Sequence, residues 1–334
     1  MLKRLAYLPY YILKTPKSQF NKYFDFVKEQ KHVSSLALFK DILTCSVKYN
    51  ISLMDYFQLR FYEHAEKERA EYAGTGFMYE YQLYMNPKKY RDVLEDKIKF
   101  LNQFKDFSGR KWATLEMLEN NPQLVREFIE NPSGKIVLKN STGQAGKEVE
   151  IFDSTGLEVS SLLTKMRTGG YDLIETFVVQ HQELMRLAPT ALNTLRIVTQ
   201  ISGNQAIIIT ARLRISVNSN VDNLTAGNCA APIDIETGIV CGPGVYGDIT
   251  KQDAYEHPVT GVAIVGFQIP FWKECLQLVT KAALMIPENR SIGWDIAITN
   301  DGPILIEGNH NWGRVLWQLP EKKGLKKDIL KYYV

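Results

Sequence analysis

The sequence predicts an α+β protein in which a mostly helical N-terminal region is followed by a part built largely from β-hairpins. Residues 1–95 are rich in Tyr, Phe, Lys and Glu and poor in Gly, and apolar residues in the run 36–47 recur at spacings of three and four. From residue 96 onward, short apolar runs alternate with turn sequences, a pattern typical of antiparallel strands. The pattern is clearest over residues 292–313, where two alternating runs flank an Asn-Asp-Gly turn.

Composition and charge exclude several classes of protein. The 334 residues, 45% of them hydrophobic, suffice for one large or several smaller globular domains. No apolar run is as long as a membrane-spanning helix, no secretory signal is recognisable, and the net charge of +3 is too small to indicate a nucleic-acid partner. The four cysteines are scattered, which predicts buried thiols in a reducing compartment rather than a zinc site. We therefore expect a cytoplasmic protein.

The first 31 residues are basic and aromatic. Seven Lys or Arg residues stand against Asp25 and Glu29, with seven Tyr or Phe residues among them. Such a surface suits docking at the anionic inner face of a membrane, or on a membrane-bound partner. The alternative is a set of helices packed on the main domain with a solvated basic side, which requires no partner.

A possible phosphate-binding hairpin follows a predicted helix at 96–108. A strand at 135–139, a loop of small residues at 141–147 and a second strand at 148–152 form the hairpin. Backbone amides of such a loop can close over phosphate groups, and Lys139 would add a positive charge at the strand end. An ordinary turn is the simpler interpretation, because the loop has neither the P-loop pattern nor a dinucleotide-binding fingerprint.

Three arginines lie within the next predicted strands. Residues 173–179 form a strand that contains Glu175, and residues 193–200 and 205–215 form an antiparallel hairpin. Among its Ile and Val residues the hairpin carries Arg196, Arg212 and Arg214. At a solvated sheet edge these arginines would be unremarkable, but three of them in apolar runs indicate that at least one faces a buried anion. A helix at 272–285 follows.

The last hairpin brings acidic residues together. We expect Thr299 to pair with Pro303 across a three-residue loop. This register sets Asp295 directly opposite Glu307, with Asn309 one diagonal away on the same face. Two carboxylates and an amide oxygen are hard ligands that suit Mg²⁺ and leave positions for water and phosphate oxygens. A solvated polar face is the alternative, but acidic groups at the end of an apolar strand are rare unless they are paired or bind metal.

In their order and spacing, these segments resemble the ATP-grasp superfamily, and most closely its sugar-transfer-associated branch. The resemblance covers residues 95–320 and rests on Asp96-Lys97 and on VLKNSTGQAGKEV, IETFVVQHQELMRLAPTALNTLRIVT, ARLRISVNSNVDNLTAGN and GWDIAITNDGPILIEGNHNWG. It implies two α+β subdomains that clasp ATP, with residues 96–174 as the small or lid subdomain and residues 175–334 as the C-terminal subdomain that carries the metal site. Residues 1–95 depart from the α/β domain that opens most ATP-grasp enzymes.

The resemblance also implies an ATP site. Lys97 and Lys139 would hold the α- and β-phosphates, and the loop from Gly143 to Gly146 would be the flap that covers them. The stretch from Glu175 to Val178 would be the hinge that meets the adenine through its backbone.

The remaining ATP and metal ligands follow from the same resemblance. Glu183, or else Gln180, would bind the ribose. Arg196 and Arg212 would face the γ-phosphate and an acyl phosphate. The metal ligands would be Asp295, Glu307 and Asn309. In that arrangement Glu307 bridges two Mg²⁺ ions, with Mn²⁺ as the alternative metal.

On the acceptor side, the resemblance assigns a loop that contains Asn223 and Gly227. The small residues that follow the metal-binding asparagine in the family are larger in this chain. We expect the acceptor substrate to contact this segment, namely His310, Trp312, Gly313 and Arg314.

The implied function is an ATP-dependent carboxylate–amine ligase that forms an amide through an acyl phosphate and releases ADP. Its partners would be ATP, an amino acid and a sugar (a uronic acid or an amino sugar, nucleotide- or lipid-linked) in surface-polysaccharide biosynthesis, beside a glycosyltransferase. One alternative is a sugar kinase, with His310 or Asp222 as the general base. Another is a non-catalytic nucleotide-binding protein, against which the complete metal triad argues.

Overall fold

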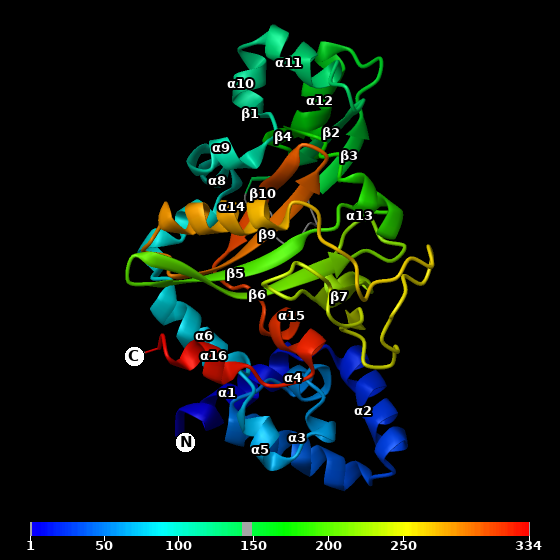
Figure 1. The fold of residues 1–334 in the computed structure, drawn as a ribbon, viewed down its shortest axis with the longest axis vertical. Helices are drawn as coiled ribbons and strands as arrows, with labels where there is room; N and C mark the ends of the chain where they lie inside the picture. Colours follow the sequence, from blue (N-terminus) through cyan, green and yellow to red (C-terminus); the bar gives the residue numbers. More distant parts are fainter. Residues whose placement is uncertain (1, 142–148, 334) are drawn as a thin grey trace.

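The computed structural model describes residues 2–141 and 149–333, with the backbone alone for residues 2–6. The chain begins with helices, as predicted, and within the described residues the first strand starts only at Trp112 (Figure 1). None of the described helices is long and apolar enough to cross a membrane. The helices of the N-terminal region are α1 (Leu2–Lys14), α2 (Lys17–Lys31), α3 (Ser35–Tyr49), α4 (Leu53–Gln58), α5 (Glu66–Ala70), α6 (Thr75–Met85) and α7 (Asp92–Glu95).

A small antiparallel sheet follows two short helices, α8 (Lys97–Gln103) and α9 (Lys105–Ser108). The strand order is β1-β4-β2-β3. The strands are β1 (Trp112–Thr114), β2 (Lys135–Lys139), β3 (Val149–Asp153) and β4 (Leu173–Thr176). Three helices pack on the sheet and form one apolar core with it, namely α10 (Leu115–Glu119), α11 (Pro122–Ile129) and α12 (Val159–Gly169).

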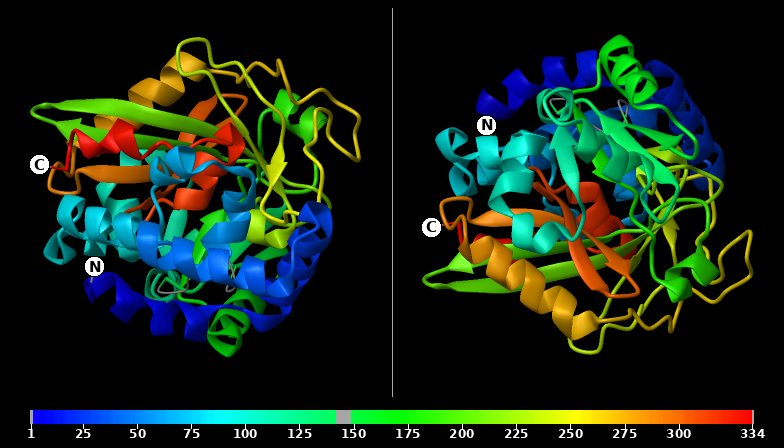
Figure 2. Two further views of the ribbon diagram at one scale, coloured as in Figure 1. Left: turned by 90° about the horizontal axis from the view of Figure 1, so that it is seen from below. Right: turned by 90° about the horizontal axis from the view of Figure 1, so that it is seen from above.

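A larger antiparallel sheet follows α13 (Gln182–Leu187), with the strand order β10-β9-β5-β6-β7-β8. Its strands are β5 (Leu195–Ser202), β6 (Gln205–Ile215), β7 (Cys229–Pro232), β8 (Val245–Tyr246), β9 (Ser291–Thr299) and β10 (Gly302–Asn309). The helix α14 (Trp272–Leu284) packs on one face, and α6, α15 (Arg314–Gln318) and α16 (Lys326–Leu330) lie on the other (Figure 2). The predicted α+β class is therefore confirmed.

The turn between β9 and β10 differs from the expectation, yet the predicted pairing survives. Thr299 pairs with Gly302 across a two-residue loop, and not with Pro303. A β-bulge between Leu305 and Glu307 then shifts the register by one residue and restores Glu307 opposite Asp295. The bulge also separates the two faces, because Leu305 joins the apolar core and Glu307 faces Asp295. The shorter loop and the bulge shift the register in opposite directions, so Asp295 and Glu307 pair as predicted.

The N-terminal helices divide between two apolar cores: α1–α4 share one in which Ile249 is the only described residue from the later chain, and α6 packs with the large sheet. Met78 and Tyr81 of α6 share a core with Val198 of β5 and with Trp312 and Trp317 near the C-terminal end. Residues on both sides of the boundary predicted at residue 95 therefore share one of these cores.

One detail of the cysteine prediction is wrong. Three of the four thiols are buried, but Cys241, in the irregular segment between β7 and β8, is exposed. All four are free.

Candidate active site

A cleft of about 1280 Å³ lies between the small and the large sheet. Its walls come from strands of both sheets, from the N-terminal helices and from the segment after β10. The cleft brings together the following predicted site residues: Lys97, Lys139, Glu175, Arg196, Asn223, Gly227, Glu307, Asn309, His310, Gly313 and Arg314. Segments that are separated by more than two hundred residues in the sequence therefore meet at one site.

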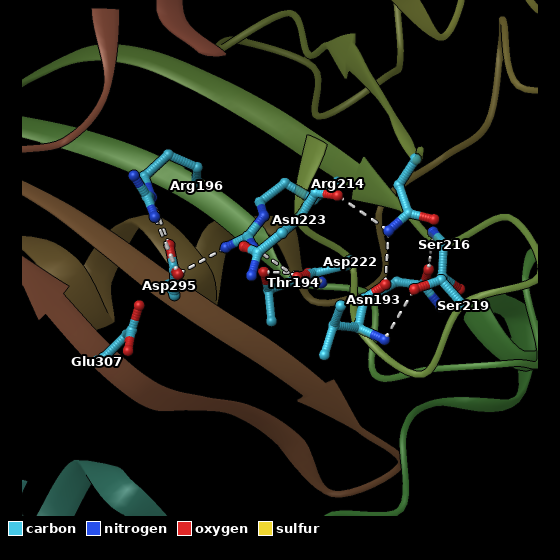
Figure 3. A network of polar contacts seen from close by, with 12 residues as sticks. Asn193, Thr194, Arg196, Arg214, Ser216, Ser219, Asp222, Asn223, Asp295 and Glu307 are labelled. Atoms are coloured by element: carbon cyan, nitrogen blue, oxygen red, sulfur yellow. Dashed lines mark hydrogen bonds and ion pairs between the residues drawn. The ribbon is translucent and has the colours of Figure 1, made fainter. Parts of the chain in front are cut away.

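Asp295 is fixed by two arginines of the large sheet. Because Arg196 pairs with Asp295 across β5 and β9, its Nε and Nη2 reach both carboxylate oxygens, and the Nη2–Oδ2 distance is 3.0 Å. Arg214 Nη1 donates to the same Oδ2 at 2.6 Å. Burial opposes ionisation of Asp295, but the two guanidinium groups prevail and lower its pKa to about 2 (Figure 3). Asp295 is therefore a permanent anion inside the sheet.

Glu307 and Asn309 offer oxygens to the cleft beside Asp295. Asn309 Nδ2 donates to Glu307 Oε1 at 3.1 Å, so the amide oxygen of Asn309 remains available. The surrounding protein and the nearby charge of Asp295 raise the pKa of Glu307 (Figure 3). Two carboxylates forced together in this way gain from a divalent cation between them, because the cation cancels their repulsion.

These donors fit Mg²⁺ through Glu307 and Asn309, which keep free oxygens. Asp295 fits only as a shared ligand, since both of its oxygens already accept from Arg196 and Arg214. Among the described residues, no group of three or more His, Cys, Asp or Glu side chains is placed to hold a metal ion. The candidate metal site consists instead of two carboxylates, those of Asp295 and Glu307, and the amide of Asn309.

The second arginine of this site is Arg214, and not the expected Arg212. Arg214 Nη2 also meets Asp222 Oδ1 at 2.6 Å and donates to Asn223 Oδ1, which ties the predicted acceptor loop to β6 (Figure 3). Asp222 in turn accepts from the backbone N and Oγ1 of Thr194, at 2.8 and 2.5 Å. The sequence marked Arg214 only as one of three strand arginines.

Arg212 and Trp312 have structural roles. Arg212 Nη2 donates to the carbonyl of Trp317 at 2.7 Å and pairs with Glu321 at 3.1 Å, on the side of α15 and away from the cleft. The Trp312 side chain is fully buried and donates to Ser291 Oγ at 3.0 Å. Neither side chain lines the cleft in this arrangement, so their predicted contacts with phosphate and substrate stay predictions.

The predicted phosphate lysines line the same cleft. Lys97 Nζ donates to the carbonyl oxygens of Asn140 and Ser141 at 2.8 and 3.2 Å. Lys139 Nζ lies 2.7 Å from Glu175 Oε2. Burial opposes the ionisation of Glu175, but Lys139 and Arg110 lower its pKa to about 2.

Several residues expected around the adenine and the ribose lie elsewhere. Glu183 is on α13, where it pairs with Arg186 at 2.7 Å, and it does not line the cleft. The Gln180 side chain is buried, donates to the carbonyl of Ala188 and does not line the cleft. Val178 is also absent from the cleft wall. Gly143 and Gly146 lie outside the described residues.

The N-terminal helices supply part of the cleft wall, which the sequence did not indicate. Asp55 of α4 is fully buried and holds Arg314 through Oδ1, at 2.5 Å from Nη2. Lys22 of α2 pairs with Asp248 at 2.7 Å, and the Tyr23 hydroxyl donates to the carbonyl of Gly247 at 3.2 Å. The sequence contains the pattern of a capping box at Ser52–Asp55. Nothing in the sequence indicates that Asp55 also binds Arg314, which lies 259 positions away.

The sequence matches a known family over most of its length. A model of the sugar-transfer associated ATP-grasp family covers residues 77–332. This chain belongs to that family. The match confirms the predicted ATP-grasp fold and begins earlier than the predicted resemblance, inside α6, which packs on the large sheet.

The similar solved structures include several ligases of low sequence identity. The ATP-grasp ligase PsnB, complexed with a phosphomimetic variant of its minimal precursor, Mg and ADP, is 14% identical with a TM-score of 0.41, over 82% of this chain and 72% of that chain. The L-amino acid ligase from Bacillus licheniformis is 11% identical with a TM-score of 0.38, over 66% and 41%. D-alanyl-alanine synthetase A from Vibrio cholerae is 10% identical with a TM-score of 0.39, over 72% and 60%. This chain spans 55% of PsnB in its complex with the minimal precursor. No curated protein sequence matches it.

Buried acids make the ATP-grasp cleft sensitive to low pH. The pKa values of Glu175 and Asp295 fall to about 2 from ordinary values of 4.5 and 3.8, so the unfolded chain takes up protons first as the pH falls. Their contribution to stability is complete above about pH 4.5 and is lost as the pH falls toward about 2. Thermal unfolding at pH 7, 5 and 3 should show this loss, and it should be shallower in Glu175→Gln than in the wild type. An equal slope in the two proteins would contradict the assignment.

Proposed function

We propose that this protein is an ATP-dependent carboxylate–amine ligase that joins an amino acid to a sugar acid or an amino sugar through an acyl phosphate. The observation that carries this proposal is one cleft that is lined both by the predicted phosphate lysines and by the arginines and acidic residue of the large sheet. Lys139 comes from the small sheet and Lys97 from α8, whereas Arg196, Arg214 and Glu307 come from the large sheet. ATP would bind between them, with its phosphates directed toward Glu307 and Asn309.

The proposed chemistry has two steps. A free carboxylate does not react with an amine to form an amide, because the leaving group would have to be an oxide ion, which is a very poor one. Attack of a carboxylate oxygen on the γ-phosphorus of ATP forms a P–O bond and breaks the bond to ADP, which leaves an acyl phosphate. The amine then attacks the carbonyl carbon, a C–N bond forms, phosphate departs and the amine loses a proton. Bound Mg²⁺ would neutralise phosphate charge and polarise the transferred group.

The chain's own residues would assist through fixed positive charge. Arg196 and Arg214 are held in place by Asp295, so they need no reorganisation when negative charge develops nearby. Gly313 lines the cleft, where its amide would contribute a donor to an oxyanion. The sugar part of the proposal rests on the family description, sugar-transfer associated ATP-grasp.

A product assay tests the proposal. The purified protein would be incubated with ATP, Mg²⁺ and pools of amino acids and of uronic or amino sugars, with phosphate release and product mass as readouts. Acceptor-dependent phosphate release with a product one water lighter than the two acceptors combined would support the ligase. A phosphorylated sugar with ADP would make the protein a kinase. Nucleotide binding without turnover on any pool would make it a non-catalytic nucleotide-binding protein.

We also propose that the protein works in the cytoplasm and meets an anionic membrane through α1. Leu13 and Tyr10 are 83% and 55% exposed, and Lys14 and Lys17 follow them in the sequence. Apolar side chains with a basic rim bind anionic bilayers by insertion and charge attraction. Leu13→Glu should therefore reduce co-sedimentation with vesicles of anionic lipid, and Leu284→Glu, at an exposed leucine on α14, should not. Equal co-sedimentation of wild type and Leu13→Glu would rule out this contact.

A further inference from the structure

One buried arginine joins the two sheets at the wall of the cleft. Arg110, between α9 and β1, has a side chain that is only 3% exposed. Its Nε donates to Glu175 Oε2 of the small sheet at 2.7 Å. Its Nη1 and Nη2 donate to the carbonyl oxygens of Leu305 and Ile306 in β10, at 2.5 and 3.1 Å. A planar guanidinium is suited to hold a carboxylate and two carbonyls at once, whereas an ammonium group is a single point charge.

Glu175 has two cationic partners. Lys139 Nζ and Arg110 Nε both lie 2.7 Å from the same oxygen, Oε2. The Glu175 side chain is 4% exposed, so it must keep at least one of these partners to avoid the cost of an unpaired buried charge. With two partners, one of them can leave. If Lys139 turns to a nucleotide phosphate, Arg110 remains on Glu175.

The same guanidinium holds the backbone beside the candidate metal ligand. Leu305 and Ile306 precede Glu307 at the bulge, and Ile306 has no partner residue in the register of β9. A bulge leaves backbone groups outside the regular ladder, and these need other hydrogen-bond partners. Arg110 gives the Ile306 carbonyl such a partner.

We propose that Arg110 is a positioning residue that links nucleotide binding at Lys139 to metal binding at Glu307. It keeps Glu175 neutralised when Lys139 engages a phosphate, and it fixes the bulge that turns Glu307 toward Asp295. The inference rests on the proposed nucleotide site and not on the identity of the acceptor.

Two substitutions separate the two tasks of Arg110. Arg110→Met leaves Lys139 as the only cation on Glu175, so metal-free affinity for a fluorescent ATP analogue should fall at least tenfold. Adding Glu175→Gln removes the carboxylate that retains Lys139, and affinity should return to within threefold of wild type.

Arg110→Lys keeps a cation on Glu175 but loses the two hydrogen bonds to the carbonyl oxygens of Leu305 and Ile306. It should bind the metal-free analogue within threefold of wild type, yet need at least tenfold more Mg²⁺ for half-maximal binding of the metal–nucleotide complex.

The matched control is Lys111→Met, which removes the neighbouring cation, whose side chain is 69% exposed. It should leave both binding constants unchanged. Near-UV circular dichroism would check the folding of every variant. Unchanged Mg²⁺ dependence in Arg110→Lys, or unchanged nucleotide affinity in Arg110→Met, would overturn the inference. A wild type that binds no nucleotide would overturn it together with the nucleotide site, whereas normal binding without amide formation would affect only the proposed ligase.

Discussion

Glu307→Gln is expected to lower acceptor-dependent phosphate release by roughly 10³-fold, because a neutral amide replaces the carboxylate that would hold the metal on the transferred phosphate. The fold should be unaffected. The pKa of Glu307 is raised by the surrounding protein and by Asp295, so loss of its charge relieves repulsion inside the cleft. The melting temperature should therefore stay equal to that of the wild type or rise. Phosphate release and thermal unfolding, measured on the same preparation, would check both parts.

Glu183→Gln is the matched control for that variant. It makes the same chemical change at an exposed residue that was predicted to bind ribose but lies outside the cleft. Its turnover and its KM for ATP should equal those of the wild type. If Glu307→Gln kept more than about a tenth of the activity, the effect would be smaller than the loss of one well-placed charge produces, and the metal assignment would fail.

Asp55→Ala is expected to destabilise the protein by about 3 kcal/mol or more, the cost of removing one partner from a buried, hydrogen-bonded charge pair. Asp55 is fully buried and accepts hydrogen bonds from Arg314 and from both the backbone N and Oγ1 of Thr75, at 2.9 and 2.5 Å. The Ser52 amide is a further donor to it. Alanine would leave these donors without an acceptor inside the protein. Urea unfolding would measure the loss.

Glu68→Ala offers a matched comparison for Asp55→Ala. Glu68 also caps a helix by accepting from a backbone amide, that of Ala65 at 2.7 Å, but its side chain is 60% exposed. Water can replace its hydrogen bond, so the loss should stay near or below about 1 kcal/mol. Similar losses in the two variants would show that burial and the link to Arg314 contribute nothing. The N-terminal helices would then be a dispensable addition to the cleft.

The hairpin of β9 and β10 shows what the alternation of apolar and polar residues can predict and what it cannot. Alternation placed Asp295 and Glu307 on one polar face and the pairing between them is present, although the turn and the bulge were both missed. The error at the turn arose because loop length and bulges depend on how a strand packs, and a single alternating run does not encode this. Leu305 and Glu307 have the same parity in the sequence, but the bulge sends one to the core and the other to the cleft.

The arginines of β6 show a second limit. Arg212 and Arg214 have the same strand parity, so sequence alone could not choose between them. Which of the two arginines reaches the cleft depends on the residues that pack against each of them in the folded protein. Trp317 and Glu321 cover Arg212, whereas Arg214 remains open toward Asp295 and the cleft.

The sequence by itself determined the fold class, the helical beginning of the chain and eleven of the described residues that line the cleft, because apolar periodicity and turn chemistry act over a few residues. Family membership followed from the order of those segments. Only the tertiary structure decided that Arg110 bridges the two sheets and that Asp55 anchors Arg314. Buried charges take their partners from wherever the fold brings an opposite charge, and those partners lie up to 259 positions away in this chain. No local pattern records such pairs, since their energy comes from desolvation and from geometry that exist only after the chain has folded.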